Sequence, residues 1–493
     1  LEFEDKNMPA IITNKFRLHN TSNFVESFSE SSPNLYYLAI GRPQAFATST
    51  GGDSRTQFEG TDASPQTPVD SVSDEFYVFD DVIAAKKIAS TDISRVVPRR
   101  NWATGTVYDM YRHDYGQFVK GSSSSVVTAD SGATQLFDSV FYVLSSDNNV
   151  YKVLDNNGGA NSTVEPSGTS TSTLTTGDGY KWKYMYTLTA SEQVNFLSTD
   201  FMHVSTDSTV SSAATDGAID IVKIKTAGSG GANGTHTGVA IRGDGSGGVA
   251  SVTVSGGAVT AVTVTSAGSG YRFAYIRNAD IVSAGATSLS GSELDVIIGP
   301  KGGHGSDAVN ELGGFFVMMN TDFTGDESSN SGDFVVGQDF RRVALLRDPT
   351  TSGSAASATT LRGTQAVKLS GTPGTFTVDE EINQATTGAV GKVVEFDSTN
   401  KILYFIQTRF NDEGVDSNGN QTAFSGSNVI TGQSSSATGT PDTSTQTVDN
   451  ITFSSGYNTG EIDHDTDVLY QENRAPITRA SDQTENVKLI IEF

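Results

Sequence analysis

The chain has 493 residues, a formal net charge of −25 and no cysteine. Its length exceeds what one hydrophobic core usually supports, so about two to four domains are expected. The lack of cysteine excludes disulfides, thiolate metal sites and cysteine nucleophiles, and the acidic charge, with only 32 scattered Lys and Arg residues, argues against a nucleic-acid partner.

The composition favours an all-β protein. Hydrophobic residues make up 36% of the chain and 51 glycines accompany abundant Ser and Thr, as in a folded protein with many turns. No run approaches the ~18 apolar residues of a membrane span and no secretory signal is recognisable, so no membrane partner is predicted. Whether residues 1–7, which precede Met8-Pro9, are native is left open.

The first part of the chain reads as strands with a few short helices. Asn23 and Glu26 form a capping-box pattern, which predicts a short helix after Asn23 with Phe24 and Phe28 one turn apart. Apolar spacing and turn residues predict further elements: a helix at 71–81, strands at 36–40, 140–144 and 181–188, and an exposed Ser/Gly/Thr-rich loop at 121–135.

The composition changes after residue 205, where Gly, Ser, Ala, Val and Thr become dominant. Residues 221–231 (IVKIKTAGSGG) and 261–271 (AVTVTSAGSGY) match at a constant shift of 40 residues. In each copy an alternating strand runs into an AGSG turn, where glycine can adopt a positive φ. The repeat predicts a small β module made of two similar hairpin units.

A second repeat lies between about residues 360 and 442. Four residues recur with the same mutual spacing after a shift of 48 positions: Phe376, Ile382, Ala389 and Gly391, then Phe424, Ile430, Ala437 and Gly439. Each copy predicts a hairpin, and residues 401–410 (KILYFIQTRF) between them form the clearest strand pattern of the chain. The sequence therefore predicts a second small β module, with low-complexity Ser/Thr-rich segments at its flanks.

The sequence ends on a predicted strand. Four apolar side chains stand at every second position: Val487, Leu489, Ile491 and Phe493. This period is typical of a half-buried strand, so we expect the segment to be part of a sheet. Lys488 and Glu492 fall on its opposite face.

Patterns for catalysis or nucleotide binding are weak. His304, Ser306 and Asp307 stand too close in sequence to orient one another as a triad. We expect instead a glycine turn in which Ser306 or Asp307 caps a short helix, residues 308–312, ended by Gly313-Gly314. The glycines of residues 243–248 match GxGxxG, but a strand-like sequence follows where a nucleotide site needs a helix. No catalytic residue, cofactor or metal ligand is predicted.

The clearest candidates for function are residues suited to subunit contacts. Arg99, Arg100 and Trp102 follow the stiff turn at Pro98, and Arg and Trp are typical of interface hot spots. The alternative is a local core in which Trp102 is buried and the arginines pair with Asp80 or Asp81. The same two alternatives apply to four residues near the C-terminus: Tyr470, Glu472, Asn473 and Arg474.

Several segments, in order along the chain, carry a family resemblance. They are PAIITNKFR (9–17), LAIGR (38–42), VVPRRNW (96–102), GDGYKWKYMYTL (177–188), FRRVALLRDP (340–349), and YQENRAPI followed by SDQTE near the C-terminus. Together they resemble the baseplate wedge protein family of T4-type contractile-tailed phages, gene product eight in that family's naming. Any one of these blocks alone would be uninformative, whereas their common order makes the resemblance specific.

The resemblance implies a β-sandwich core with short helices in its loops and an opening strand within residues 9–17. It also implies a non-enzymatic homodimer in the virion baseplate, assembled in the host cytoplasm, whose partners are the family's gene products six, seven and ten. Such a protein connects wedge subunits and takes part in the rearrangement that triggers sheath contraction.

Both repeat modules depart from the family pattern and are interpreted as insertions into loops. The predicted organisation is a core in three pieces, residues 8–205, 304–353 and 456–493, interrupted by modules at 206–303 and 354–455. An alternative function is a carbohydrate-binding or depolymerising tail adhesin, because Gly/Ser/Thr-rich β modules suit that class too. An aromatic-lined surface on a module would favour this alternative.

Overall fold

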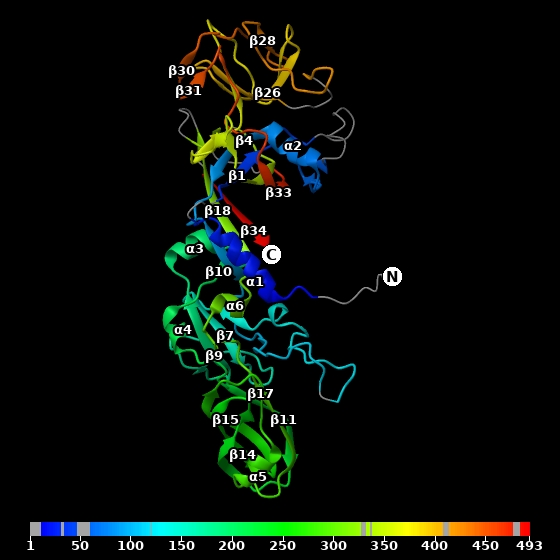
Figure 1. The fold of residues 1–493 in the computed structure, drawn as a ribbon, viewed down its shortest axis with the longest axis vertical. Coiled ribbons are helices and arrows are strands. Elements are labelled where there is room, and N and C mark those ends of the chain that lie inside the picture. Colours follow the sequence, from blue (N-terminus) through cyan, green and yellow to red (C-terminus); the bar gives the residue numbers. More distant parts are fainter. Residues whose placement is uncertain are drawn as a thin grey trace, which may run out of the picture. The chain divides into compact units, whose positions relative to one another are not determined.

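The computed structural model describes residues 11–30, 34–46, 60–119, 121–326, 332–335, 338–407, 414–476 and 484–493. Strands dominate this part of the chain, which confirms the all-β prediction (Figure 1). The chain forms two compact units. Unit 1 comprises Leu1–Asn23, Ser94–Met318 and Ile490–Phe493, and unit 2 comprises Phe24–Ile93 and Met319–Leu489.

The helices are few and short in the described residues: α1 (Asn14–Glu26), α2 (Val72–Asp81), α3 (Ala190–Phe196), α4 (Ser208–Ala213), α5 (Asn278–Ser283) and α6 (Ala308–Leu312). Helix α2 confirms the helix predicted at 71–81. None of these helices is long and apolar enough to cross a bilayer.

The opening strand expected within residues 9–17 is wrong for its described part, because α1 begins at Asn14. Thr13 caps the helix, since its hydroxyl accepts a hydrogen bond from the backbone N–H of Phe16. The helix expected after Asn23 is also misplaced, because α1 ends at Glu26. The rings of Phe24 and Phe28 do meet edge to face, with centroids 5.4 Å apart.

The main core of unit 1 surrounds a four-stranded antiparallel sheet. Its order is β6 (Tyr142–Leu144), β7 (Asn149–Asp155), β9 (Lys181–Thr187) and β8 (Leu174–Thr175). These strands confirm the predictions at 140–144 and 181–188. Both faces of β9 are covered, since Trp182, Tyr184, Met185 and Tyr186 are all buried. Residues 121–135, which were predicted as a loop, contain no strand or helix.

A second sheet contains the C-terminal strand. Its order is β10 (Phe201–His203), β5 (Ile93–Pro98), β18 (Phe316–Asp326) and β19 (Phe334–Val335), and β34 (Thr484–Glu492) pairs with β18. The predicted alternation of β34 holds for Val487 and Leu489, which are buried. The predicted strand at the C-terminus is therefore confirmed as part of a sheet.

Arg17 of α1 joins the N-terminal helix to the end of this strand. Its Nε donates to the carbonyl oxygen of Phe493, and its Nη2 pairs with the carboxylate of Glu492. The guanidinium also lies 3.6 Å from the centre of the Phe315 ring. Glu492 is thus engaged with Arg17, although it lies on the polar face of the strand.

Unit 2 is built on a five-stranded antiparallel sheet. Its order is β23 (Thr360–Arg362), β4 (Val82–Lys87), β1 (Tyr36–Gly41), β20 (Arg342–Arg347) and β33 (Asp467–Asn473). Ala39 in the central strand pairs with Ala85 on one side and Ala344 on the other. The small side chains leave room for Val78 and Phe79 of α2 in the core cluster on this sheet. Two short hairpins accompany it, β2 (Gly60–Thr61) with β3 (Ser64–Pro65) and β21 (Thr350–Thr351) with β22 (Ser354–Ala355).

The first predicted module, residues 206–303, forms three small sheets. They are β11 (Ile221–Ser229) with β17 (Ser290–Ile297), β12 (Gly234–Ala240) with β14 (Ser246–Ser255) and β15 (Ala258–Ser269), and β13 (Arg242–Gly243) with β16 (Ala274–Tyr275). The AGSG turns of the repeat are alike, with φ of +69° and +62° at Gly228 and Gly268. Strand β14 begins at Ser246, inside the GxGxxG pattern, so a strand stands where a nucleotide site needs a helix, as the sequence predicts.

The two similar hairpin units expected there are not formed. Strand β11 pairs with β17 at the far end of the module, whereas its repeat copy β15 pairs with β14. The first and last strands of the module pair because the chain leaves and re-enters the rest of unit 1 at one place, where Ile221 is opposite Ile297.

The second predicted module, residues 354–455, contributes most of a seven-stranded sheet. Its order is β29 (Thr438–Gly439), β28 (Ile430–Gly432), β25 (Glu381–Gln384), β26 (Ala389–Asp397), β27 (Ile402–Ile406), β24 (Gln365–Lys368) and β32 (Tyr457–Asn458), with β30 (Gln446–Val448) and β31 (Ile451–Phe453) as a separate hairpin. Both predicted repeat hairpins are present, β25–β26 and β28–β29. All five residues of β27 are buried, as its pattern predicts, and the rest of that predicted strand, 408–410, lies outside the described residues.

Candidate subunit-contact sites

Arg99 and Arg100 follow β5 and are held by contacts within unit 1. The Nη1 of Arg99 donates to the carbonyl of Ser198 at 2.8 Å, and its Nε donates to the side chain of Asn101 at 2.9 Å. The guanidinium of Arg100 lies 5.5 Å from the centre of the Tyr142 ring. Both arginines are half-buried, so part of each side chain stays accessible in a fixed position.

Trp102 is also half-buried and packs against the main core of unit 1. Its indole N–H donates to the hydroxyl of Ser162 at 3.1 Å, and its backbone N–H donates to the carbonyl of Leu144 at 2.8 Å. Arg99, Arg100 and Trp102 therefore form one rigid, partly exposed corner after β5.

The acidic partners considered for these arginines are engaged elsewhere. Asp81 is fully buried and accepts two hydrogen bonds of 2.9 Å from Nη1 of Arg342. Asp80 accepts from the side-chain amide of Gln421 at 3.2 Å. Within the described residues neither Arg99 nor Arg100 forms an ion pair.

The second predicted group lies on β33, the edge strand of the unit 2 sheet. The hydroxyl of Tyr470 donates to the carboxylate of Glu472 at 2.9 Å. Burial, followed by this hydrogen bond and the charge of Glu472, raises the pKa of Tyr470 to about 12. Since the two residues are two positions apart on one strand, their side chains share a face.

Asn473 and Arg474 complete this group at the end of β33. The side chain of Asn473 accepts from Nε of Arg342 at 3.1 Å and donates to the carbonyl of Gln66 at 3.0 Å. The guanidinium of Arg474 lies 5.8 Å from the centre of the Phe340 ring. The two predicted groups thus lie in different units, and each is ordered by its own intramolecular contacts.

A buried arginine network supports the second group. Arg341 makes a bidentate pair with Asp62, with both distances 3.0 Å, and donates to the carbonyl of Pro43 at 2.6 Å. Arg342 pairs with Asp81 and also holds Asn473. The buried guanidinium groups of these two neighbouring arginines are thus each paired with a carboxylate, as buried charges need to be.

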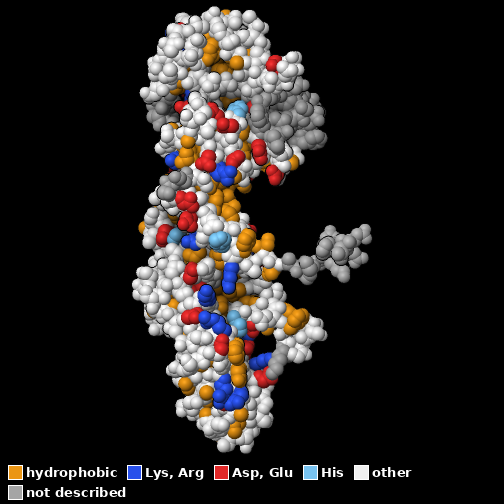
Figure 2. All heavy atoms as spheres, in the orientation of Figure 1, with side chains coloured by type: hydrophobic (Ala, Val, Ile, Leu, Met, Phe, Trp, Pro, Cys, Tyr) orange, Lys and Arg blue, Asp and Glu red, His pale blue; other side chains and the backbone are white. Residues whose placement is uncertain are grey.

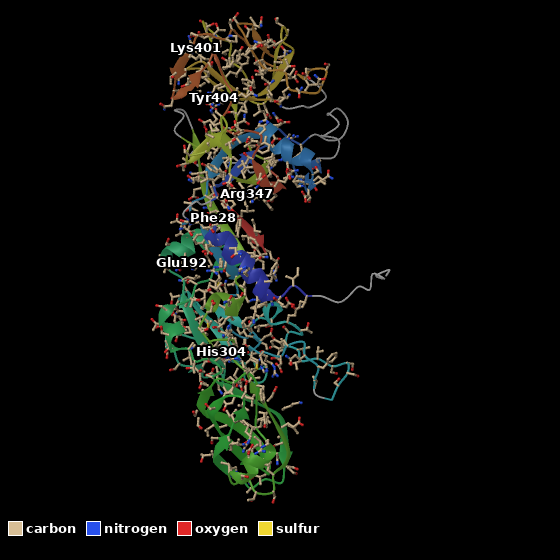
Figure 3. All side chains as sticks on the ribbon, viewed as in Figure 1. Phe28, Glu192, His304, Arg347, Lys401 and Tyr404 are labelled. Atoms are coloured by element: carbon tan, nitrogen blue, oxygen red, sulfur yellow. The ribbon has the colours of Figure 1, made fainter. Side chains whose placement is uncertain are left out.

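The residues His304, Ser306 and Asp307 do not form a catalytic triad. Asp307 caps α6 by accepting from the N–H of Asn310, and Gly313 ends the helix with φ of +81°, as the sequence predicts. His304 lies near β7 and β9 (Figure 3), edge-on to the ring of Tyr111 at 4.8 Å. Burial, together with the charges of Lys152 and Lys183, holds the pKa of His304 well below its usual range.

A buried ion pair beside His304 was not found by sequence reasoning. Lys152 of β7 donates to the carboxylate of Glu311 in α6, and both side chains are almost fully buried. Glu311 also accepts from the backbone N–H groups of Gly305 and Asp307. Burial lowers the pKa of Lys152, although Glu311 opposes the shift. The only sequence signal was a Lys in the apolar strand VYKVLD, where an exposed position was the simpler interpretation.

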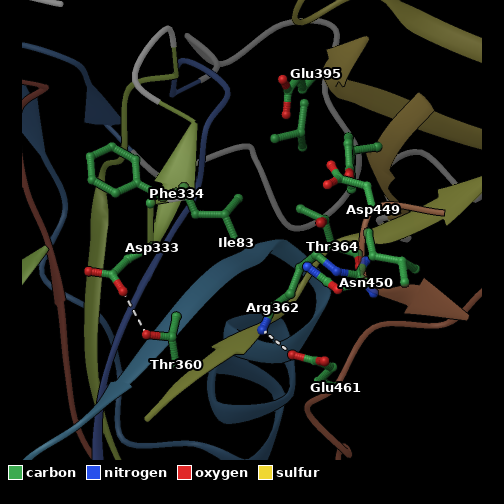
Figure 4. Close-up of a pocket in the computed structure, with 14 residues that line it drawn as sticks. Ile83, Asp333, Phe334, Thr360, Arg362, Thr364, Glu395, Asp449, Asn450 and Glu461 are labelled. Atoms are coloured by element: carbon green, nitrogen blue, oxygen red, sulfur yellow. Dashed lines mark hydrogen bonds between the residues drawn. The ribbon is translucent and has the colours of Figure 1, made fainter. Parts of the chain in front are cut away.

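Unit 2 contains a pocket of about 250 Å³ with a mixed polar and apolar lining (Figure 4). In it Asp333 accepts from the hydroxyl of Thr360, and Glu461 accepts from the backbone N–H of Arg362. Burial lowers the pKa of Arg362, whose guanidinium lies 5.9 Å from the centre of the Tyr404 ring. The volume is below the ~300–1,000 Å³ of typical ligand pockets, so we assign no ligand to it. The described residues contain no group of three His, Cys, Asp or Glu side chains suited to a metal ion.

In the described residues the candidate sites consist of ordered arginine, aromatic and amide side chains on a β-rich fold. Residues 10–155 match the family model described as Phage-Gp8: Bacteriophage T4, Gp8. The baseplate wedge protein gp8 of Enterobacteria phage T4 is 24% identical over 209 residues, which cover 40% of this chain. Both matches confirm the resemblance to the gp8-type family that the ordered motifs indicated.

The similarity is partial in both directions. The chain spans 60% of the length of the T4 relative that it matches. The family match ends at residue 155 and includes the motifs LAIGR and VVPRRNW, with Arg99, Arg100 and Trp102. The motifs at 177–188 and 340–349, and the group Tyr470 to Arg474, lie outside it.

Proposed function

We propose that this chain is a structural component of the baseplate wedge of a contractile-tailed bacteriophage. The observation that carries the proposal is the family match over residues 10–155. The matched segment supplies α1, β1, α2 and β4 to β7, which contribute to the central sheets of both units. The family likeness therefore concerns the parts of the chain that organise its fold.

In this role the chain forms a homodimer in the virion baseplate and connects neighbouring wedge proteins, the family's gene products six, seven and ten. It takes part in the rearrangement that triggers sheath contraction, and it is assembled in the host cytoplasm. The role requires binding surfaces and no catalytic centre. Ordered arginine and aromatic side chains at Arg99–Trp102 and Tyr470–Arg474 suit such surfaces, because these types dominate interface hot spots.

The two repeat modules, residues 206–303 and 354–455, are proposed as insertions into this wedge-protein core. Neither is reached by the family match. Each has its own hydrophobic cluster, which contains Val252 and Tyr271 in the first and Ile382 and Ile430 in the second. A self-contained core is what an inserted domain needs in order to fold in a loop of its host.

Light scattering of the purified chain at micromolar concentration tests the dimer, and a monomer there contradicts it. If the β33 face forms the dimer contact, Tyr470→Ala with Arg474→Ala weakens association. Leu469→Ala is the control, because Leu469 is 44% exposed on the same strand and is not one of the predicted contact residues. A density map of the virion tail tests the baseplate location directly, and absence of the chain from the wedge would contradict the proposal.

A further inference from the structure

The first predicted module carries an exposed row of side chains that takes no part in its core. Phe273, Tyr275 and Arg277 stand at every second position and are 58%, 45% and 52% exposed, whereas Ile276 between them is buried. The backbone is extended through β16 and remains extended at Arg277, with φ of −85° and ψ of 143°. Tyr275 and Arg277 therefore point to one face of the module, and Phe273 is exposed in the bend directly before β16.

Arg242 joins this row from the neighbouring strand. Strands β13 and β16 are antiparallel, and Arg242 is directly opposite Tyr275. Residues in this relation have side chains on the same face, about 4.5–5.5 Å apart at Cβ. We call Arg242, Phe273, Tyr275 and Arg277 the Arg–aromatic patch.

The two guanidinium groups of the patch are held by one buried carboxylate. Asp280 accepts two hydrogen bonds from Arg242, of 2.7 and 2.8 Å, and two from Arg277, of 2.8 and 2.9 Å. Asp280 is 9% exposed, whereas the side chain of Arg242 is 42% exposed. The surface thus presents two fixed positive groups above one hidden negative group, and these three groups sum to a charge of +1.

The patch differs in charge from the rest of the chain, whose formal net charge is −25. Figure 2 shows Lys and Arg side chains gathered beside hydrophobic ones over the part of the molecule where Figure 1 labels β14 and β15. The backbone is fixed as well, because the N–H groups of Arg272 and Phe273 both donate to the carboxylate of Asp244. A rigid, locally positive surface of this kind is complementary to an anionic partner.

We propose that the Arg–aromatic patch binds an anionic polysaccharide. The rings of Phe273 and Tyr275 stack on the apolar faces of sugar rings. The Nη1 groups of Arg242 and Arg277, which take no part in the pairing with Asp280, donate to carboxylate, sulfate or phosphate groups. Same-face neighbours on a strand are about 6.6 Å apart, so the row offers successive contacts to an extended polymer. Two rings in a narrow row suit a polymer chain better than the broad apolar centre of a protein interface. This binding is separate from the structural role proposed above.

The test measures binding of the full chain to polygalacturonate, which carries one carboxylate per sugar. Neutral dextran, poly-L-glutamate and oligo-dT are the comparison polymers, matched in length. We expect binding to polygalacturonate, none to dextran, and at least about tenfold weaker binding to poly-L-glutamate and oligo-dT, because these lack the sugar faces that the rings contact.

Two double variants test the residues. Phe273→Ser with Tyr275→Ser removes the rings, and Arg242→Lys with Arg277→Lys keeps the charges that pair with Asp280 but removes the planar forks. Each is expected to weaken polygalacturonate binding about tenfold. Phe118→Ser and Lys225→Gln are matched controls outside the patch, at residues whose side chains are 66% and 41% exposed, and they leave binding unchanged.

An unchanged thermal melt shows that each variant is folded. Equal affinity for polygalacturonate and poly-L-glutamate overturns the proposal in favour of an acidic protein partner. Preferential binding to oligo-dT, or unaltered binding after removal of both rings, overturns it as well.

Discussion

The two predicted modules are made of similar pieces that are arranged differently. In the second module the two repeat hairpins lie next to each other in one sheet, because Ile382 of β25 pairs with Gly432 of β28. In the first module the two repeat strands, β11 and β15, pair with different partners. A sequence repeat thus reproduces the strand and its turn, but the strand's partner depends on where the chain must enter and leave.

The modules also differ in how they join their units. The first shares Ile221 and Ile297 with the main core of unit 1, and ion pairs join Lys223 to Asp155 at 2.7 Å and Asp295 to Arg112 at 2.5 Å. The cluster of the second module shares no described residue with the cluster on the unit 2 sheet. The first module is therefore integrated into its unit, and the second is the more separable.

The two modules also differ in their balance of basic and acidic residues. Residues 221–297 contain five basic and four acidic residues, whereas residues 365–448 contain four basic and nine acidic residues. Since exposed charge selects partners and repels like charge, modules of similar construction present different surfaces. We infer that they serve different contacts.

Excision of each module gives the largest expected difference. Replacing residues 364–459 with Gly-Gly should leave a soluble, cooperatively melting protein, because Gly460 already lies against the carbonyl of Gly363. Replacing residues 206–299 with a Gly/Ser linker should cause aggregation, since it removes Ile221 and Ile297, each worth about 1.5–3 kcal/mol when buried. Solubility and thermal melting measure both, and equal behaviour of the two proteins contradicts the contrast.

Removing Glu311 should strongly destabilise the region where the first module rejoins unit 1. Glu311→Ala leaves the charge of Lys152 buried without its partner, which costs about 3–5 kcal/mol in free energy of unfolding. Denaturant unfolding measures the loss. Lys152→Met with Glu311→Gln should recover part of it, because the amide oxygen can still accept from the backbone N–H groups of Gly305 and Asp307. Glu293→Ala, in an exposed pair, is the control. A wild-type midpoint for Glu311→Ala would show that the pair is not needed.

Because the two hairpins of the second module repeat each other, equivalent core substitutions in them should lower stability by similar amounts. Ile382 and Ile430 are equivalent in the repeat and both fully buried, so each change to Ala should lower the free energy of unfolding by about 2–5 kcal/mol. The exposed residues Val378 and Val429 provide controls, because their change to Ala should have little effect. Costs that differ between the two isoleucines by more than about 2 kcal/mol would mean that the hairpins are not equivalent.

The smallest expected effect is on pH and salt dependence, through one carboxylate in each module. Arg277 and Arg242 lower the pKa of Asp280. Burial acts to raise the pKa of Glu380, but hydrogen bonds from Ser435 and two other backbone amides lower it overall. Both groups therefore contribute stability above their ordinary range near pH 4, and the contribution is lost as pH falls through the lowered folded value.

The variants Asp280→Asn and Glu380→Gln distinguish the ion pairs that lower the pKa of Asp280 from the hydrogen bonds that lower the pKa of Glu380. At pH 7 both should lower the melting temperature, and the difference from wild type should shrink towards pH 2. Added salt should reduce the effect of Asp280→Asn, because its partners are exposed charges, and should leave that of Glu380→Gln nearly unchanged. Equal salt dependence would contradict the distinction.

Much of the local structure follows from the sequence. Strands β1, β9 and β27, helix α2, the capped helix α6 and both repeat hairpins of the second module lie where apolar period and turn residues predict them. These signals are local, since an alternating strand or a capped turn depends on residues within a few positions. The ordered motifs likewise indicated the family without the structure.

The tertiary structure alone decided which distant residues meet. The sequence around Lys152 does not indicate that its side chain pairs with Glu311, 159 residues away. The sequence around Arg242 likewise does not indicate that it lies opposite Tyr275. The start of α1 was missed because Thr13 gives a cap signal weaker than the Asn23 and Glu26 pattern. Which strands and side chains pair depends on burial and on where distant strands come together. The sequence by itself therefore determined the secondary-structure elements and the family resemblance. The tertiary structure determined the strand and ion pairs, the shared hydrophobic cores and the exposed patch.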